Sequence, residues 1–255
     1  MTAKRPVALV TGAGRRVGRA IALDLAAHGW NVAVHYNGSA AQARSAVKAI
    51  ERSGGKGIAL QADLGDETAV RTLLPQATKA LGPVSCLVNS AAVFEDDRVR
   101  TASRESWDFH METNLRAPFV LSQSFAKLLP RRLSGNIVNI LDQRVRNLTP
   151  YFISYTVSKM GLWTLTRSMA LALAPRIRVN AIGPGPVLPS THQSEAQFRR
   201  QWSLLPLARS TPPDEIARGV RFILEAPSLT GQMIALDGGQ HLGWGHVPAG
   251  KGTDE

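Results

Sequence analysis

The sequence predicts an α/β fold, a single domain built on a doubly wound parallel sheet of about seven strands with helices on both faces. Short apolar runs rich in Val and Ile alternate with longer helical patterns along the whole chain. Such repeated strand–helix–strand units favour a parallel sheet. Glycine-rich or polar segments follow the predicted strands, as expected where the carboxyl ends of parallel strands form a binding crevice.

The first half of the chain contains four predicted strands separated by helical patterns. The strands are Val7–Val10, Asn31–His35, Ile58–Gln61 and Cys86–Asn89. The helices between them are Arg16–His28, Ala40–Ser53 and Asp66–Leu81. Glycine follows each of these helices, which is typical of a helix end because glycine readily adopts the left-handed conformation.

The second half continues the pattern. A helical stretch from Ser103 leads into a second helix near Asn114–Leu129. A strand at Asn136–Leu141 precedes a helix from Tyr155 that is apolar nearly all the way round. The remaining predicted elements are a strand at Arg178–Ile182, a helix at Pro213–Glu225 and a strand at Met233–Leu236. We expect one domain over residues 1–242, with a lid near Ser190–Ser210, and a polar tail over residues 243–255.

Composition limits the class of protein. The chain has 255 residues, of which 44% are hydrophobic and 19% charged, values typical of a soluble enzyme. Cys86 is the only cysteine, and the six histidines show no metal-ligand spacing. With no signal-peptide pattern and no membrane-length apolar run, we expect a cytoplasmic, metal-free protein that binds no membrane.

The net charge of +11 has two interpretations. A basic chain can bind nucleic acid, but the basic residues here are scattered as isolated pairs, such as Arg15–Arg16 and Arg199–Arg200. No basic helix face or aromatic-interleaved patch is present in the sequence. A basic surface with a site for an anionic cofactor is therefore favoured over nucleic-acid binding.

Tyr155 and Lys159 form the strongest candidate for chemistry. They are separated by one helical turn, so they lie on one face and can act on one small volume. A lysine cation beside the phenol would lower the pKa of the tyrosine and make it a proton donor near neutral pH. The alternative is a helix-surface pair without function, and Tyr151 is a weaker rival because no lysine follows it at this spacing.

The turn after the first strand is suited to phosphate binding. It reads Thr11-Gly12-Ala13-Gly14-Arg15-Arg16-Val17-Gly18 and leads directly into a helix. Glycines let the backbone approach a pyrophosphate, and a helix N-terminus favours anions. Its position between a strand and a helix strengthens this interpretation.

Taken together, the motifs resemble those of short-chain dehydrogenases/reductases. TGAGRRVG, Asn89-Ser90-Ala91, Asn114, Tyr155-x-x-x-Lys159 and Pro184-Gly185 occur in the order and spacing of that family, over residues 6–242. The resemblance implies a Rossmann-type fold, a nicotinamide cofactor and a homotetramer. A tetramer also fits the helix from Tyr155, whose apolar residues spread over more than one face.

The resemblance also implies site residues. Asn114, Asp142, Tyr155 and Lys159 are the expected catalytic residues. The expected cofactor contacts are Gly12, Arg15, Arg16, Val17, His35, Tyr36, Asn37, Ser39, Asp63, Leu64, Asn89, Ser90, Ala91, Tyr155, Lys159, Pro184, Gly185 and Val187. The expected substrate contacts are Arg16, Phe94, Asp142 and Tyr155. Asp63 has a simpler alternative, a turn residue that starts the next helix.

Two departures from the family pattern point to one branch. Arg16 stands where the family has glycine, and Asp142 replaces the catalytic serine. Both features are similar to the pteridine reductases, whose His-Tyr-x-x-Ser sequence is matched by His35-Tyr36-Asn37-Gly38-Ser39 and whose stacking phenylalanine is matched by Phe94. Ala92 departs from that branch, where a serine contacts cofactor and substrate.

The chemistry of Asp142 and Phe94 leaves alternatives open. An aspartic acid can deliver a proton to a ring nitrogen, whereas serine suits a substrate carbonyl. The simpler alternative for Asp142 is a cap for the loop after the fifth strand. Phe94 either stacks on the substrate or belongs to the core.

The sequence therefore favours an NADPH-dependent reductase of a pterin-like ring. NADPH is expected over NADH because the second strand ends without an acidic residue that would bind the ribose 2′-hydroxyl, and Arg15 can contact a 2′-phosphate. One alternative is a reductase of an unrelated carbonyl or imine compound. Another is a non-catalytic protein that senses a dinucleotide, although such proteins commonly lack the tyrosine or the lysine.

Overall fold

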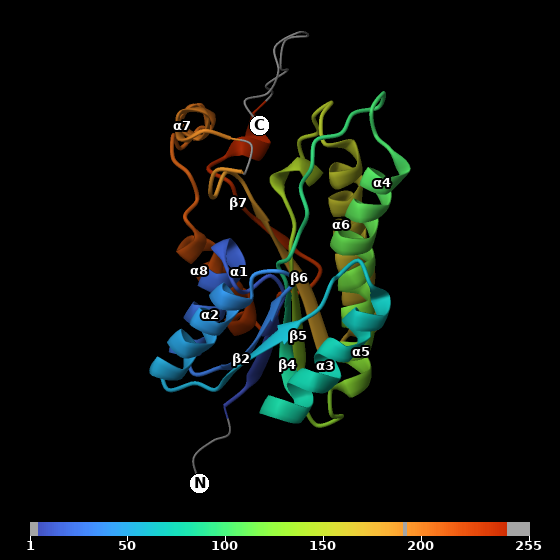
Figure 1. Ribbon diagram of the computed structural model, residues 1–255, viewed down its shortest axis with the longest axis vertical. Helices are drawn as coiled ribbons and strands as arrows, with labels where there is room; N and C mark the ends of the chain where they lie inside the picture. Colours follow the sequence, from blue (N-terminus) through green and yellow to red (C-terminus); the bar gives the residue numbers. More distant parts are fainter. Residues whose placement is uncertain (1–4, 191–192, 244–255) are drawn as a thin grey trace.

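A computed structural model of the chain describes residues 5–190 and 193–243. Seven parallel strands form one sheet in the order β3-β2-β1-β4-β5-β6-β7 (Figure 1). The strands are β1 (Val7–Val10), β2 (Asn31–Tyr36), β3 (Gly57–Gln61), β4 (Val84–Asn89), β5 (Gly135–Ile140), β6 (Ile177–Pro184) and β7 (Met233–Leu236). The predicted doubly wound parallel sheet is confirmed, and each predicted strand lies in it.

Helices cover both faces of the sheet. One face carries α1 (Arg16–Ala27), α2 (Ala40–Arg52) and α8 (Pro213–Glu225). The other face carries α3 (Glu67–Leu81), α5 (Ala117–Leu128) and α6 (Ile153–Leu173). The two groups stand on opposite sides of the strands in Figure 1.

Strand periodicity explains why the core has two halves. Successive residues of a strand point to opposite faces, so Val7 and Leu9 of β1 pack under α3 and α5, whereas Ala8 and Val10 pack under α1. All four are buried, as expected for a parallel strand covered on both sides. Burial of each Val or Leu side chain stabilises the fold by about 1.5–3 kcal/mol.

Two helical elements differ from the prediction. The segment near Ser190–Ser210, for which no secondary structure was predicted, contains α7 (Glu195–Ser203). A capping box joins Ser194 and Gln197 at its start, and this S-x-x-Q spacing is the sequence signal that could have found it. The helix predicted from Tyr155 begins two residues earlier, at α6 residue Ile153. The residue before it, Phe152, has the left-handed backbone conformation (φ +56°).

Shorter elements surround the sheet edge that carries the polar loops. They are α4 (Arg104–Met111), a π-helical turn η1 (Glu112–Arg116) between α4 and α5, and two 3₁₀ turns, η2 (Gln143–Val145) and η3 (Gln240–Leu242). Residues 244–255 of the predicted tail lie outside the described residues. None of the described helices is both long and apolar enough to cross a membrane.

Candidate active site

A cavity of about 760 Å³ lies at the carboxyl ends of the strands, where the sheet order reverses between β1 and β4. Its volume is that of a cofactor or substrate site. The predicted site residues that line it are Gly12, Arg15, Arg16, Val17, His35, Tyr36, Asn37, Ser39, Asp63, Leu64, Ser90, Ala91, Phe94, Asp142, Tyr155, Lys159, Pro184, Gly185 and Val187. Asn89 and Asn114 do not line it.

The glycine turn packs closely against neighbouring backbone at the end of the cavity. Gly12 has φ +65°, and a Cβ there would lie 3.0 Å from Ala91 Cα. A Cβ on Gly18 would lie 2.5 Å from the Gly12 carbonyl oxygen, so the start of α1 packs directly on the turn. No side chain caps this helix, and its first turn contains no acidic residue. The free N–H groups favour an anion at this end of the cavity.

Arg16 occupies a position that glycine would adopt more easily. Its φ is +52°, the left-handed region, which explains why a glycine is the usual residue there. Its guanidinium donates to the carbonyl oxygens of Leu188 (3.2 Å) and Pro189 (3.0 Å). Arg16 therefore ties the glycine turn to the segment after β6 at the rim of the cavity.

His35 has a structural role that the sequence did not reveal. Its ring is 1% exposed, with Nδ1 accepting the Gly12 N–H (3.1 Å) and Nε2 lying 3.1 Å from the Ala62 carbonyl oxygen. Burial lowers the pKa of His35 to about 4, which keeps the imidazole neutral. His35 lines the cavity and also fixes the glycine turn.

Thr11 was missed as a site residue although it belongs to the same motif. Its hydroxyl oxygen accepts the N–H groups of Ser90 (2.9 Å) and Ala91 (3.0 Å). This contact joins the ends of β1 and β4, which are neighbours in the sheet. Thr11 therefore sets the distance between the two loops that face the cavity.

Asn89, predicted to line the cofactor, is instead buried between strands. Its Nδ2 donates to Asn139 Oδ1 (2.8 Å), and Asn139 Nδ2 donates to Thr166 Oγ1 (2.8 Å). This chain of side chains joins β4, β5 and α6. Asn89 lies within β4 and is buried, so its side chain is outside the cavity lining, and its contact with the cofactor stays a prediction.

The side chain of Asn114 binds the backbone of the loop that follows β4. Its Oδ1 accepts the Val93 N–H (2.9 Å), and its Nδ2 donates to the Val93 carbonyl (3.0 Å) and to Ser158 Oγ (3.2 Å). It lies in η1, and π-helical turns frequently occur at functional sites. Asn114 fixes the loop after β4 against α6 and touches no cavity surface in this structure.

Tyr155 and Asp142 meet in the cavity wall. The Tyr155 hydroxyl donates to Asp142 Oδ2 at 2.9 Å, and Asp142 Oδ1 accepts the Arg144 N–H at 2.8 Å. One oxygen of Asp142 therefore caps the loop and the other faces Tyr155, and its role in proton transfer stays a prediction.

The expected lowering of the Tyr155 pKa is wrong for this arrangement. Burial raises the pKa of Tyr155 well above its ordinary value, the charge of Asp142 and the hydrogen bond to it act in the same direction, and Arg144 opposes them. Lys159 lies 5.7 Å from the Tyr155 ring centroid and donates to the Ile140 carbonyl oxygen (2.9 Å). Burial lowers the pKa of Lys159 to about 8, against the opposing charge of Asp142.

Phe94 is part of an aromatic wall of the cavity. Its ring stacks on Phe152 (centroids 4.2 Å apart, planes at 8°) and meets the Tyr155 ring edge-on at 4.7 Å. The buried guanidinium of Arg144 lies 5.6 Å from the Phe94 centroid and 5.0 Å from that of Phe152. One face of Phe94 is thus covered by Phe152, while the side chain still lines the cavity.

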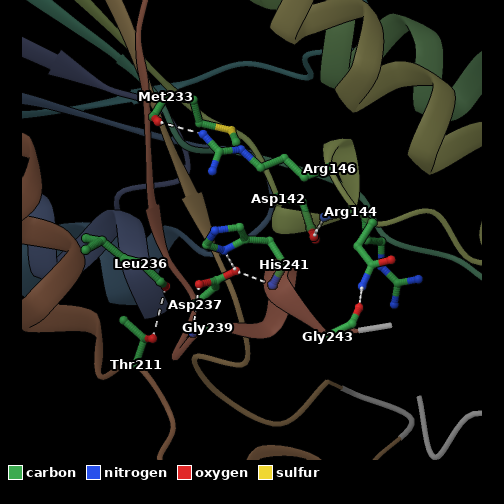
Figure 2. Close-up of polar contacts among 11 residues, drawn as sticks. Asp142, Arg144, Arg146, Thr211, Met233, Leu236, Asp237, Gly239, His241 and Gly243 are labelled. Atoms are coloured by element: carbon green, nitrogen blue, oxygen red, sulfur yellow. Dashed lines mark hydrogen bonds and ion pairs between the residues drawn. The ribbon is translucent and has the colours of Figure 1, made fainter. Parts of the chain in front are cut away.

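Other residues at this edge were not predicted. Figure 2 shows the buried Asp237 carboxylate accepting the N–H groups of Gly239 (3.0 Å) and His241 (2.8 Å) and contacting His241 Nδ1 (2.7 Å). Asn147 Nδ2 donates to the Gly243 carbonyl oxygen (2.9 Å), which joins this turn to the loop behind Asp142. The turn places Gln240 in the cavity lining.

The fold and the cavity define a dinucleotide-binding oxidoreductase with a tyrosine–lysine pair. Residues 12–241 match the family described as Enoyl-(Acyl carrier protein) reductase, and the chain belongs to the short-chain dehydrogenases/reductases. Among the described residues, no group of three His, Cys, Asp or Glu side chains could hold a metal ion.

Solved structures and curated relatives resemble the chain over nearly its full length. FolM Alternative dihydrofolate reductase 1 from Brucella canis, complexed with NADP, is 48% identical with a TM-score of 0.92, covering 96% of this chain and 98% of that one. Its Brucella suis counterpart, also with NADP, is 50% identical with a TM-score of 0.91 and the same coverage. The 3-oxoacyl-[acyl-carrier-protein] reductase FabG of Staphylococcus aureus is 34% identical, covering 92% of this chain and 98% of that protein.

Proposed function

We propose that this protein is an NADPH-dependent reductase that converts a pterin-like ring from the dihydro to the tetrahydro form. The observation that carries the proposal is the hydrogen bond from Tyr155 to Asp142 inside the cavity. A carboxyl group at this position can exchange a proton with a ring nitrogen, which a serine hydroxyl suits less well. The likeness to the two Brucella proteins, named as dihydrofolate reductases, supports the same substrate class.

The cavity fits a nicotinamide dinucleotide in its shape and charge. The uncapped start of α1 and the close approach of Gly12 to Ala91 suit a pyrophosphate. At the end of β2, the residues that line the cavity are His35, Tyr36, Asn37, Gly38 and Ser39, with no carboxylate to repel a 2′-phosphate. Arg15 is exposed beside them and offers a guanidinium. The similar structures that contain NADP support NADPH as the cofactor.

The catalytic residues then have distinct roles. Bound NADPH would supply the hydride that reduces a C=N bond of the ring. The Tyr155–Asp142 pair gives its one proton to the ring nitrogen and is then reprotonated from solvent. The second oxygen of Asp142 accepts the Arg144 N–H, which fixes the carboxylate in place. Lys159 keeps a positive charge behind the pair and is held by the Ile140 carbonyl. Phe94 and Arg144 form a wall against which a flat, polar ring can lie.

Reduction of a carbonyl compound is the second candidate, because the Staphylococcus aureus relative is a 3-oxoacyl reductase. The two functions are separated by steady-state oxidation of NADPH with dihydrobiopterin, dihydromonapterin and dihydrofolate, and in parallel with 3-oxoacyl thioesters. We expect turnover with the pterins. Turnover with the thioesters alone would replace the proposal by the second candidate.

Variants test the role of Asp142 in the same assay. Asp142→Ala should lower kcat with the pterin by about a hundredfold or more, the size expected when the proton-donating pair loses one member. Asp214→Ala, on the exposed face of α8, is the matched control and should keep the original rate. A pterin reductase whose kcat is unchanged by Asp142→Ala would contradict the proton-transfer role.

A further inference from the structure

The segment 93–97, between β4 and α4, is held in register by hydrogen bonds at every second residue. Asn114 binds both the N–H and the carbonyl oxygen of Val93 (2.9 and 3.0 Å). The Glu95 N–H donates to Nε2 of the buried His110 at 3.1 Å. Asp97 makes the next set of contacts, to α6. The intervening Phe94 is the residue of this segment that stacks beside Tyr155.

Asp97 connects the segment to the first turn of α6. Its Oδ1 accepts the Ser154 N–H (3.0 Å), and its carbonyl oxygen accepts the Ile153 N–H (3.2 Å). Its Oδ2 accepts the hydroxyls of Ser154 and of Ser106, the latter at 2.7 Å. Phe152, the residue at the N-cap of α6, provides no side-chain acceptor. Asp97 therefore supplies the acceptors that this helix start lacks, although it lies 57 residues away in the sequence.

The same contacts fix the geometry of the aromatic wall. Phe152 directly precedes the two residues whose N–H groups Asp97 holds, and Tyr155 directly follows them. Phe94 lies three residues before Asp97 and packs on both rings. Because Asp97 is 3% exposed and outside the cavity lining, it acts on the cavity only through these neighbours.

We propose that Asp97 is a positioning residue that sets the distance between Phe94 and Tyr155 and thereby the affinity for the substrate ring. This inference rests on the proposed pterin reduction. Loss of the Asp97 carboxylate removes its bonds to Ser154 and Ser106 and leaves the backbone bond to the Ile153 N–H, so the segment 93–97 is held less tightly on α6 and Phe94 shifts. Tyr155, Asp142 and Lys159 keep their own contacts with each other and with β5, so the chemical step is affected less than binding.

Kinetics of three variants test the proposal. Asp97→Ala should raise KM for the dihydropterin about tenfold or more, change kcat by less than about threefold, and leave the NADPH Kd unchanged. Asp97→Asn should restore most of the affinity, because its Oδ1 still accepts the Ser154 N–H and serine hydroxyls can accept from its amide. The matched control is Asp96→Ala, because Asp96 is the exposed neighbour whose carboxylate pairs with Arg98 on the surface. Equal losses in kcat and in NADPH affinity with Asp97→Ala would overturn the positioning role.

Hydrogen exchange provides a readout that needs no substrate. In the NADPH-bound protein, Asp97→Ala should speed exchange at the amides of Glu95 and Ser154, whereas Asp96→Ala should not. Unchanged exchange at both amides would overturn the inference even if pterin is a substrate. A wild-type protein that neither binds nor reduces pterins would instead refute the proposed function.

Should Asp97→Ala fail to fold, a second variant tests the same inference. Ser106→Ala removes one hydrogen bond to Asp97 and should raise KM for the dihydropterin to a smaller extent. An unchanged KM would contradict the inference.

Discussion

The hydroxyl of Tyr155 lies 2.9 Å from Asp142 Oδ2 and donates its hydrogen bond to that carboxylate. Burial and the charge of Asp142 both raise the pKa of the phenol, so Tyr155 remains protonated at neutral pH. The pair thus holds one proton inside the cavity, and this proton lies on the Tyr155 hydroxyl. In the proposed reduction it passes to the ring nitrogen, and the pair then takes up a replacement proton from solvent.

Replacing Tyr155 tests whether that proton is used. Tyr155→Phe should lower kcat by about a hundredfold or more and leave the NADPH Kd within about threefold, because only the hydroxyl is removed. The measurement is steady-state turnover together with NADPH binding by fluorescence. Tyr151→Phe is the control, since Tyr151 lies in the loop before α6 and does not line the cavity. Retention of most activity by Tyr155→Phe would remove Tyr155 from the mechanism.

The lowered pKa of Lys159 leads us to expect that activity decreases at alkaline pH. Its pKa is lowered to about 8 by burial, so the side chain loses its charge as the pH rises through about 8. The cation balances Asp142, and we expect kcat/KM for NADPH to fall in the same range. Lys159→Arg keeps a charge at all these pH values and should move the decline to higher pH, while Lys159→Ala should weaken both turnover and NADPH binding. An unchanged pH profile in the Lys159→Arg protein would assign the decline to another group.

Sequence periodicity was sufficient for the sheet because the central strands are covered on both faces and therefore read as short, mainly apolar runs. The predicted lining positions from Gly12 to Val187 came from the resemblance to the family. The topology explains why they meet, because loops that follow parallel strands converge at one edge. Their convergence follows from topology and needs no knowledge of side-chain directions.

Side-chain direction is what the sequence did not reveal. Asn89 and Ser90 are adjacent, but only Ser90 lines the cavity, since successive residues point to opposite sides. Asp97 is one of three consecutive acidic residues, and nothing local distinguishes the buried one from its exposed neighbour. Its partner on α6 becomes adjacent only through the fold. The raised pKa of Tyr155 likewise depends on burial, which spacing along a helix does not report.

Arg15 should determine the preference for NADPH over NADH. It is exposed in the cavity lining, whereas the neighbouring Arg16 is held by the carbonyl oxygens of Leu188 and Pro189. Arg15→Ala should raise the NADPH Kd about tenfold, the loss of one charge-assisted contact, with little effect on NADH. Arg52→Ala, at the exposed end of α2, is the control. A wild-type enzyme that used NADH as efficiently as NADPH would contradict the cofactor assignment.

His35 makes the stability of the protein depend on pH in a defined window. In the unfolded chain an imidazole takes up a proton as the pH falls below about 6.5, but the folded protein excludes it down to about 4. The contribution of neutral His35 to the free energy of unfolding is therefore complete above about pH 6.5 and is lost as the pH falls through about 4. This contribution is roughly 3 kcal/mol. Because His35 accepts the Gly12 N–H, its protonation would also release the glycine turn.

The free energy of unfolding, measured with urea between pH 7 and pH 4, should decrease less steeply for His35→Gln than for the wild-type protein. Glutamine does not titrate, and its Oε1 is a possible acceptor for the Gly12 N–H, so the variant should be less stable at pH 7 but closer to the wild type at low pH. His28→Gln, at the exposed end of α1, is the control for removing an imidazole from the surface. Parallel pH dependences for His35→Gln and the wild type would show that His35 does not control stability in this window.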